Sequence, residues 1–324
     1  MRITVLAGGV GAARFLRGLK AAVHRGGEPA AGPDDEITVI GNTGDDITLF
    51  GLRVCPDLDT VMYTLGGGIH EGQGWGRVDE TFGVSDELRV YGAGPDWFTL
   101  GDKDIATHLV RTRMLDAGYP LSAVTEALCA RWKPGVRLLP ATDARAETHV
   151  VLEDAEGRRA VHFQEWWVRL HAEPAAAEIV AMGAETASPA PGVLDAISTA
   201  DVVLFPPSNP VVSIGTILSV PGIKDAVVAK TVVGVSPIIG GAPVRGMADA
   251  CLTAIGVQTT ATAVAKHYGP ELLNGWLVDD QDKAEAEDLA ELGFEVRAMP
   301  LYMRDLPSTT AIARAALDLA RELS

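Results

Sequence analysis

The residues best suited to chemistry are four carboxylates that follow an apolar run at residues 37–40. The run is rich in β-branched side chains, which is typical of a buried strand. In an open parallel sheet, ligands bind beyond the carboxyl ends of the strands. The run is followed by a turn-prone cluster, Asn42, Thr43 and Gly44, and by the acids Asp45, Asp46, Asp57 and Asp59. Adjacent acids repel one another, and a divalent cation can relieve that repulsion because hard cations prefer carboxylate oxygens. The alternative is a polar loop whose Asx side chains cap the next helix, but four acids in this setting favour a site.

A glycine-rich turn follows the first expected strand, residues 2–7, and opens a helix. Gly8, Gly9 and Gly11 there allow backbone N–H groups to approach a phosphate at a helix N-terminus. The Walker pattern is absent because no G-K-[ST] follows, and the dinucleotide fingerprint is incomplete because Arg14 takes its third glycine position. A phosphate or diphosphate site of another kind remains, with Arg14 as an anion partner. A tight turn packed on the sheet is the structural alternative.

A second charged cluster begins near residue 100. Asp102 is expected to cap an amphipathic helix, and Lys103 and Asp104 follow it directly. Lys can hold phosphoryl oxygens while an acid binds metal or accepts a proton. His108 and Arg111 come one and two turns later. Taken alone, the segment is more typical of a capped, charged helix start than of a site.

The remaining pattern alternates strands with helices and predicts an α/β fold with a Rossmann-like, mostly parallel sheet flanked by helices. We expect one domain of 324 residues, with a core of residues 1–68 and 200–324 and an insert of residues 69–199. The insert is expected to contain an aromatic loop that could act as a lid (69–100), helices and a β-hairpin (148–152 with 159–163). The other expected helices lie at 57–65, 121–132, 282–291 and 308–323, and a further helix begins at about Ser213. The other expected strands lie at 201–205, 231–235, 275–278 and 294–297. A surface loop is expected at 25–36, and an Ala-rich segment at 172–200 leads back to the core.

Small polar residues follow two strands of the second half. Ser208 and Asn209 come after the strand at 201–205, and Ser236 comes after the strand at 231–235. Hydroxyl and amide groups at these strand exits suit nucleotide recognition in the same crevice, although turn chemistry alone also explains them.

The composition narrows the class of protein. A net charge of −16 argues against nucleic-acid and anionic-membrane partners. Three scattered cysteines indicate reduced thiols rather than a disulfide scaffold. Neither a secretory signal pattern nor an apolar run of transmembrane length is present, so we expect a cytoplasmic protein.

Taken together, the motifs of this chain resemble those of the CofD family of 2-phospho-L-lactate transferases, in the same order and over nearly the whole length. They lie at residues 8–11 (Gly-Gly-Val-Gly), 42–46 (Asn-Thr-Gly-Asp-Asp), 55–60 (Cys-Pro-Asp-Leu-Asp-Thr), 101–104 (Gly-Asp-Lys-Asp) with 106–108 (Ala-Thr-His), 206–210 (Pro-Pro-Ser-Asn-Pro) and 236–241 (Ser-Pro-Ile-Ile-Gly-Gly). These enzymes belong to the biosynthesis of the deazaflavin coenzyme F-420. The Ala-rich, acidic sequence looks most like the actinobacterial branch, for which the resemblance implies an enolpyruvyl rather than a lactyl substrate.

The resemblance implies a Mg²⁺-dependent transfer from a guanosine diphospho-linked three-carbon acid. The ribityl hydroxyl of the deazaflavin Fo attacks the phosphorus that bears the acid, GMP leaves, and coenzyme F-420-0 or its dehydro form results. Asp45 and Asp59 are expected to hold the metal, with Asp46 at the same site or orienting the hydroxyl. Lys103 and Asp104 are expected to act at the phosphoryl group or on the Fo chain. The expected ligand-binding residues are Gly8, Gly9, Gly11, Arg14, Asn42, Thr43, Ser208, Asn209 and Ser236 for the donor, and Trp75 for stacking on the deazaflavin.

The family also suggests a homodimer. Two alternatives remain open. One is a non-catalytic nucleotide-sugar-binding regulatory protein of the same superfamily, which would not need both acidic motifs. The other is a nicotinamide-dependent oxidoreductase, which the incomplete dinucleotide fingerprint disfavours.

Overall fold

A parallel sheet forms the centre of the molecule. The computed structural model describes residues 1–23, 36–155 and 157–324, so the loop expected at 25–36 lies outside this part except for residue 36. Within it, the strands of the sheet follow the order β14-β13-β10-β9-β1-β2-β5, and every neighbouring pair is parallel. They are β1 (Arg2–Ala7), β2 (Glu36–Gly41), β5 (Arg137–Pro140), β9 (Val202–Phe205), β10 (Val232–Val235), β13 (Gly275–Val278) and β14 (Glu295–Ala298). This architecture confirms the predicted α/β fold.

The chain reverses its direction of travel across the sheet at β1. β2 and β5 lie on one side of β1, and β9 leads to the remaining strands on the other side. Such a reversal leaves a crevice at the carboxyl ends of the two strands that flank it. The positions after β1 and β9 therefore lie together at the edge of the sheet where ligands bind in folds of this kind.

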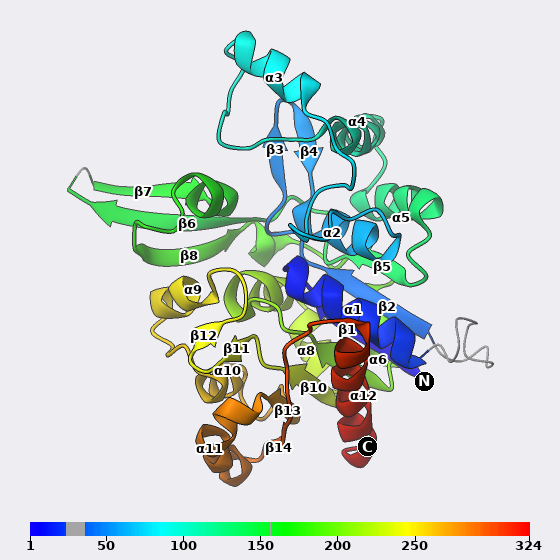
Figure 1. Cartoon of the computed structure of the whole chain (residues 1–324), viewed down its shortest axis with the longest axis vertical. Coiled ribbons are helices and arrows are strands. Elements are labelled where there is room, and N and C mark those ends of the chain that lie inside the picture. Colours follow the sequence, from blue (N-terminus) through cyan, green and yellow to red (C-terminus); the bar gives the residue numbers. More distant parts are fainter. Residues whose placement is uncertain (24–35, 156) are drawn as a thin grey trace.

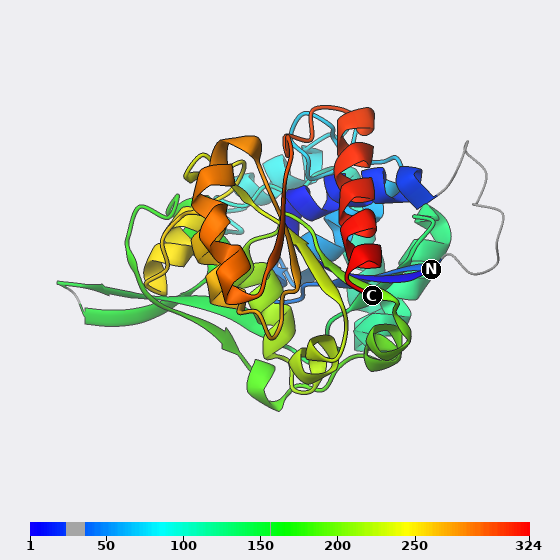
Figure 2. The same cartoon turned by 90° about the horizontal axis from the view of Figure 1, so that it is seen from below.

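Helices cover both faces of the sheet because the strands are apolar on both sides. Figures 1 and 2 show the sheet between the two helical layers. One layer packs against Ile3 and Val5 of β1, and the other packs against Leu6 and Ile40. The first layer contains α1 (Gly9–Val23), α2 (Pro56–Leu65), α5 (Leu121–Trp132) and α12 (Leu306–Glu322). The second contains α6 (Val193–Thr199), α7 (Thr216–Ser219), α8 (Ile223–Val228), α9 (Ala248–Ala254) and α10 (Ala261–Tyr268), and α11 (Lys283–Ala286) contacts α10.

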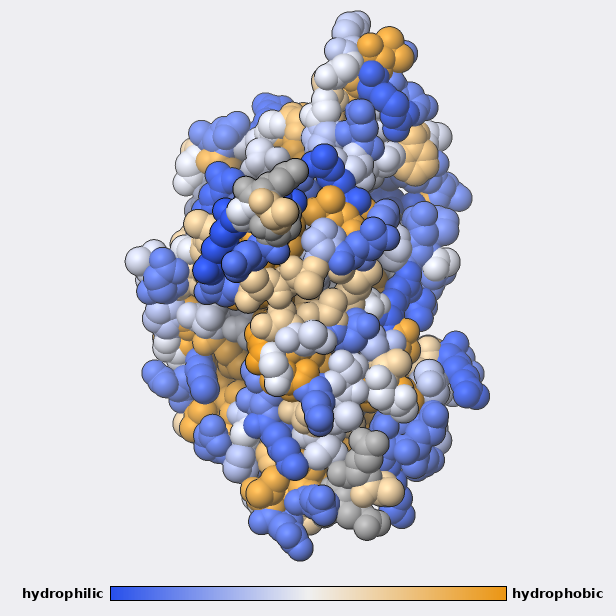
Figure 3. Space-filling model, turned by 90° about the vertical axis from the view of Figure 1, so that its left-hand side faces the viewer, coloured by the Kyte–Doolittle hydropathy of each residue, from blue (hydrophilic) through white to orange (hydrophobic). Residues whose placement is uncertain are grey.

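A second sheet projects from the core beside α9 (Figure 1). It is antiparallel, with the order β7-β6-β8, and comprises β6 (Glu147–Asp154), β7 (Gly157–His162) and β8 (Ala176–Met182). The predicted hairpin is confirmed, and Trp166 is fully buried against its base. β8 was not predicted. It lies within the Ala-rich segment expected at 172–200, and its alanines form a strand only because they pair with β6. Figure 3 views the molecule from this side and shows hydrophobic groups near the middle of a mostly hydrophilic face.

A third group of elements forms the end of the molecule at the top of Figure 1. It contains β3 (Ile47–Leu49), β4 (Leu52–Val54), α3 (Gly83–Val90) and α4 (Asp102–Asp116), packed around Ile47, Leu49, Val54, Leu100 and Ile105. Asp102 was expected to cap its own helix, and this expectation was wrong. Gly101 is the capping position, and the Asp102 carboxylate instead accepts hydrogen bonds from the Gly83 and Val84 N–H groups at the start of α3.

Two other segments differ from expectation. β5 was not predicted as a strand, and it pairs with β2 in the main sheet although it lies within residues 69–199. The helix expected from about Ser213 begins as a π-helical turn, Pro210–Gly215, before α7. A small hairpin of β11 (Ile238–Ile239) and β12 (Ala242–Pro243) follows β10. In the part of the chain that the structure describes, no helix combines the length and the apolar character needed to cross a membrane.

Candidate active site at the carboxyl edge of the sheet

The glycine turn after β1 meets the polar turn after β9. The Gly8 N–H donates to Ser208 Oγ at 3.3 Å, and the Ser208 hydroxyl donates to the Gly8 carbonyl at 2.9 Å. A Cβ at Gly11 would lie 2.2 Å from the carbonyl oxygen of Pro207. Glycine is therefore required at position 11 by close backbone approach, and the two motifs form one structural unit at the switch point.

Asp57 joins the glycine turn to the acid cluster. Its Oδ1 accepts from the Gly9 N–H at 2.8 Å, and its Oδ2 accepts from Asn42 Nδ2 at 2.9 Å. Gly9 has a φ of +75°, a conformation that favours glycine and aims its N–H at this carboxylate. Burial raises the pKa of Asp57 to about 6, although both hydrogen bonds oppose that rise. Asp57 was noted in the sequence but was given no role.

Asp45 lies in the same network. Its Oδ1 accepts from Asn42 Nδ2 at 3.1 Å, and its Oδ2 accepts from Gln164 Nε2 at 3.4 Å. Burial and the neighbouring charge of Asp57 raise the pKa of Asp45 well above its usual value. Three buried carboxyl groups therefore lie in one small region. Asn42 joins Asp45 to Asp57, and Asp46 directly follows Asp45 in the chain.

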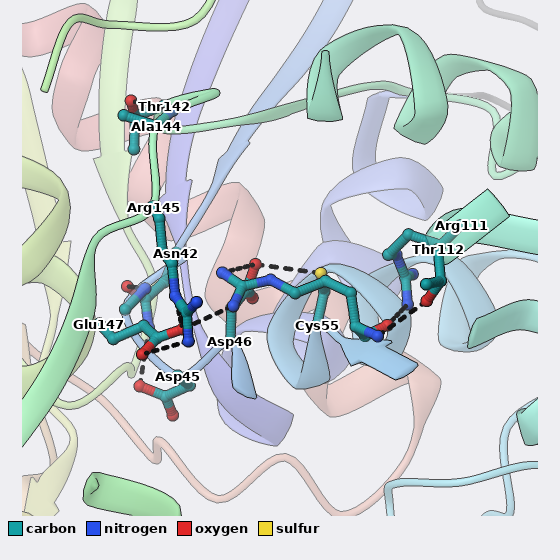
Figure 4. Close-up of polar contacts among 12 residues, drawn as sticks. Asn42, Asp45, Asp46, Cys55, Arg111, Thr112, Thr142, Ala144, Arg145 and Glu147 are labelled. Carbon is teal, nitrogen blue, oxygen red and sulfur yellow. Dashed lines mark hydrogen bonds and ion pairs between the residues drawn. The ribbon is translucent and has the colours of Figure 1, made fainter. Parts of the chain in front are cut away.

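Asp46 is held by a different set of residues. Its Oδ2 accepts from Arg53 Nη2 at 3.3 Å and from the Cys55 thiol at 3.0 Å, while Arg53 Nη1 donates to Glu147 at 2.6 Å. Figure 4 shows Asp46 and Cys55 pointing toward one another, with Glu147 nearby. Burial raises the pKa of Asp46 to about 7, against the opposing effects of Arg53 and Cys55.

Asp59 forms a buried ion pair with Arg111 of α4. Arg111 also lies 3.0 Å from His108 Nδ1, and His108 Nε2 lies 3.4 Å from Asp104 Oδ2. The hydroxyl of Tyr63 donates to Asp104 at 2.7 Å. His108 and Arg111, both 1% exposed, therefore connect the acids of the 55–60 motif to those of the 101–104 motif.

Two carboxylate oxygens of this region are buried without a hydrogen-bond partner in the described residues, Asp46 Oδ1 and Asp59 Oδ2. A buried acceptor without a partner is costly, and hard oxygen ligands of this kind suit Mg²⁺. The described residues contain no group of three or more Asp, Glu, His or Cys side chains placed to hold a metal. Mg²⁺ commonly takes only one or two carboxylates together with substrate phosphates, so the oxygens of Asp46 and Asp59 fit such an ion.

Several predicted residues make contacts away from this network. Lys103 Nζ donates to the Val78 carbonyl at 3.1 Å. Asn209 Oδ1 accepts from the Val211 and Val212 N–H groups and caps the π-helical turn. The hydroxyl of Ser236 donates to the Ile238 carbonyl inside its own turn. Thr43 is buried in the turn that carries Asp45, and its carbonyl accepts from the Asp46 N–H. Their expected roles at ligands stay predictions.

Trp75 and Arg14 lie near the glycine turn. Trp75 is 52% exposed, and the guanidinium of Arg245 stands 5.1 Å from its ring centroid. Arg245 also lies close enough to Arg14 for the two charges to interact. Arg245, Arg53, Glu147 and Gln164 were not singled out in the sequence. Arg245, Glu147 and Gln164 carry no local signal, because each joins the site through a partner distant in the chain. Arg53 is only seven residues from its partner Asp46 and could have been noticed.

Comparisons with known proteins give relatives over nearly the whole chain. The model of the family described as 2-phospho-L-lactate transferase CofD matches residues 3–301. A phosphoenolpyruvate transferase of Thermobifida fusca is 71% identical over 323 residues, covering 100% of this chain and 99% of that protein. One of Kitasatospora aureofaciens is 65% identical over 325 residues, with the same coverage. A crystal structure of protein BH3568 from Bacillus halodurans has a TM-score of 0.61 at 18% identity, covers 98% of this chain and 99% of that chain, and supports the fold.

Proposed function

Because the chain belongs to the CofD family of transferases, we propose that it transfers a phosphoenolpyruvyl group to the deazaflavin Fo. The donor is the guanosine diphospho-linked acid, and the products are GMP and dehydro-coenzyme F-420-0. The observation that carries the proposal is the hydrogen bond from the Gly9 N–H to Asp57, which joins a phosphate-type glycine turn to a cluster of buried carboxylates. Phosphoryl transfer needs both parts together, a cradle for the diphosphate and a means of neutralising charge.

The transfer step exchanges one P–O bond for another. The ribityl hydroxyl of Fo attacks the phosphorus that bears the three-carbon acid, and the bond from that phosphorus to the GMP oxygen breaks. The proton of the hydroxyl passes to a carboxylate of the acid cluster, and GMP leaves with the bonding electron pair. The resulting phosphodiester links Fo to the acid.

The predicted roles follow from placement and charge. Gly8, Gly9 and Gly11, with Ser208, are proposed to hold the diphosphate at the N-terminus of α1. The Gly8 and Gly9 N–H groups donate to Ser208 and Asp57 in the structure, so the diphosphate would take over these two donors when it binds. Asn42 orients Asp45 and Asp57 through two hydrogen bonds from one amide nitrogen. Trp75, half exposed, provides a surface on which the deazaflavin stacks.

Asp45 and Asp59 are the proposed Mg²⁺ ligands. Asp46 is the alternative to Asp45, because Asp46 Oδ1 has no hydrogen-bond partner in the described residues, whereas both oxygens of Asp45 accept from side-chain amides. When bound, the ion would neutralise charge on the transferring phosphoryl group. Asp104 is oriented by Tyr63 and by His108, whose hydrogen bond and charge outweigh the effect of burial and lower the pKa of Asp104. Asp104 and Lys103 are proposed to contact the phosphoryl group or the Fo chain.

Donor choice rests on the relatives. Proteins named phosphoenolpyruvate transferase share 71% and 65% identity with this chain over its full length. The enolpyruvyl donor is therefore proposed over the lactyl donor.

The proposal is tested by turnover of Fo with purified protein and Mg²⁺. The two guanosine diphospho-linked donors, lactate and enolpyruvate, are supplied in parallel and products are followed by mass spectrometry. GMP release with faster use of the enolpyruvyl donor is expected. Absence of product from either donor, in protein that still binds a guanine or uridine nucleotide, would instead support the non-catalytic binding protein.

The metal ligands are tested separately. Asp45→Ala and Asp59→Ala are each expected to lower kcat by at least about a hundredfold and to raise the Mg²⁺ concentration needed for half-maximal rate, because each removes a hard ligand. Direct titration of each variant with Mn²⁺ provides a readout that does not depend on turnover. Intact turnover in either variant would remove that residue from the metal site.

A further inference from the structure

Arg245 lies in the loop between β12 and α9, beside Arg14 of α1, and the roles proposed above leave Arg245 unused. Gly74 of the neighbouring loop lies between Arg245 Nη1 and the side chain of Val10, so Arg245 stands beside the first turn of the helix that carries Arg14. Burial, and secondly the charge of Arg14, lowers the pKa of Arg245. Neither has an ion-pair partner within residues 1–23, 36–155 and 157–324. Two neighbouring cations without an acid repel each other, and that repulsion is relieved when an anion binds between or beside them.

Arg245 also contacts the loop formed by residues 69–77. Its Nη2 donates to the Gln73 carbonyl, and its guanidinium carbon lies 5.1 Å from the Trp75 ring centroid. The position of a Cβ at Gly74 would be 3.1 Å from Arg245 Nη1 and 2.6 Å from the side chain of Val10. The loop is therefore packed between Arg245 and the glycine turn that begins α1.

The two arginines favour a ligand that contains phosphate groups. Arg presents a planar fork of donors that matches phosphate oxygens, and it binds them more strongly than a neutral donor would. Arg14 lies on the first turns of α1, whose N-terminus faces the crevice where the glycine turn and Ser208 meet. A diphosphate seated on that turn brings negative charge to both arginines at once.

We propose that Arg14 and Arg245 together bind the diphosphate of the nucleotide donor, and that Arg245 couples this binding to the loop at residues 69–77. The inference rests on the proposed function for the identity of the donor. Its consequence is that a bound diphosphate fixes Arg245, and Arg245 in turn fixes Gln73 and Trp75. The donor thereby orders the aromatic surface proposed for the deazaflavin.

The chain offers a matched control. Arg17 lies on the same helix as Arg14 and forms an exposed ion pair with Glu71 of the same loop at 2.8 Å. Arg17→Gln removes a cation and a loop contact, but it removes no group assigned to the diphosphate. Arg14→Gln, Arg245→Gln and Arg245→Lys are compared with it, and thermal unfolding of each variant establishes that it is folded.

The first measurement is calorimetric binding of GDP, with guanosine as the probe that lacks phosphates. Arg14→Gln and Arg245→Gln are each expected to weaken GDP binding about tenfold or more, because a charge-assisted hydrogen bond is lost. Arg245→Lys is expected to fall between wild type and Arg245→Gln because it keeps the charge but loses the fork. Arg17→Gln should change GDP binding less than about twofold, and guanosine binding should be the same in all variants.

The second measurement is hydrogen exchange of residues 69–77 with and without GDP. Protection of this loop is expected to rise with GDP in the wild type and in Arg17→Gln but not in Arg245→Gln. Unchanged GDP affinity in Arg245→Gln, or an equal loss in Arg17→Gln, would overturn the inference. These assays need no transfer reaction: a protein that binds GDP as expected but makes no product refutes the proposed transfer and leaves the arginine site standing.

Discussion

Asp59 shows how the predicted metal site is also part of the structural framework. Its carboxylate is buried against Arg111, whose guanidinium contacts His108 and the Arg53 carbonyl as well. A charged group in this setting is stable only while its partner is present, because removing one member leaves the other desolvated and uncompensated.

Asp59→Asn is therefore expected to lower the free energy of unfolding by about 3–5 kcal/mol. Urea denaturation measures this directly, and Arg111→Met should cost a similar amount. The double variant should recover much of the loss, since replacing a buried pair with neutral groups is often tolerated. The exposed pair of Asp318 and Arg321 provides the control, and Asp318→Asn should change stability by under about 1 kcal/mol. Equal effects at the two sites would contradict this interpretation.

A substitution at Gly11 tests the contact between the turns after β1 and β9. Gly11→Ala places a methyl group against the Pro207 carbonyl, and overpacking of this kind costs about 1–3 kcal/mol. The same substitution at Gly83, the first residue of α3, adds only an ordinary contact of 3.5 Å with Asp102 Oδ2, and alanine is the better helix former. Thermal unfolding should therefore separate the two variants, with reduced GDP binding in Gly11→Ala alone. A stable Gly11→Ala variant with normal GDP binding would show that the turns can separate without loss.

At the scale of elements, the π-helical turn Pro210–Gly215 links the β9 motif to the acid cluster. Asn209 caps this turn, and the Val212 carbonyl within it accepts from Asn42 Nδ2 at 3.2 Å. The cap therefore supports the residue that orients Asp45 and Asp57. This structural role is separate from the predicted contact of Asn209 with the donor.

Substitutions at Asn209 distinguish the two roles. Asn209→Ala should lower the free energy of unfolding by about 1 kcal/mol, whereas Asn209→Asp and Asn209→Ser keep an accepting oxygen and should be close to wild type. The measurements are thermal unfolding and KM for the donor. A donor KM raised in Asn209→Asp without a loss of stability would support a ligand contact by the amide. Equal stability of all three variants would argue against the cap.

At the scale of the whole molecule, the sheet gathers motifs from both halves of the chain at one edge. Turns after β1, β2 and β9 supply the glycines, the acids and Ser208, while α4 contributes Arg111 and Asp104 from the projecting end of the molecule. The division into a core of residues 1–68 and 200–324 with an insert of residues 69–199 stays a prediction, as does the lid at 69–100.

The predicted homodimer is tested by the mass of the protein in solution. Light scattering after size-exclusion chromatography should give about twice the 34.0 kDa of the chain. Large exposed side chains at the end of α3, such as Val90 and Tyr91, are of the kind that mark contact surfaces. A mass of one chain across a range of concentrations would refute the dimer.

The sequence by itself determined the elements with strong local signals. β-branched runs marked β1, β2, β9 and β10, because burial of both sheet faces selects such residues wherever the chain enters the core. The glycine turn and the acids after β2 were predicted for the same reason, since strand exits in a parallel sheet share one edge. β5 and β8 were missed because their strand state depends on pairing with β2 and β6.

Only the tertiary structure decided which partner each charged side chain contacts. Arg245 donates to the neutral Gln73 carbonyl across 172 positions, and two ion pairs also join distant positions. Asp59 meets Arg111 across 52 positions, and Arg53 meets Glu147 across 94. No local pattern encodes these pairs, because an ion pair depends on distance in space and on burial rather than on spacing along the chain. The sequence thus identified the acids and the glycine turn that is proposed to bind phosphate, and the fold determined their partners, the raised pKa values of the buried acids and the loop that Arg245 contacts beside them.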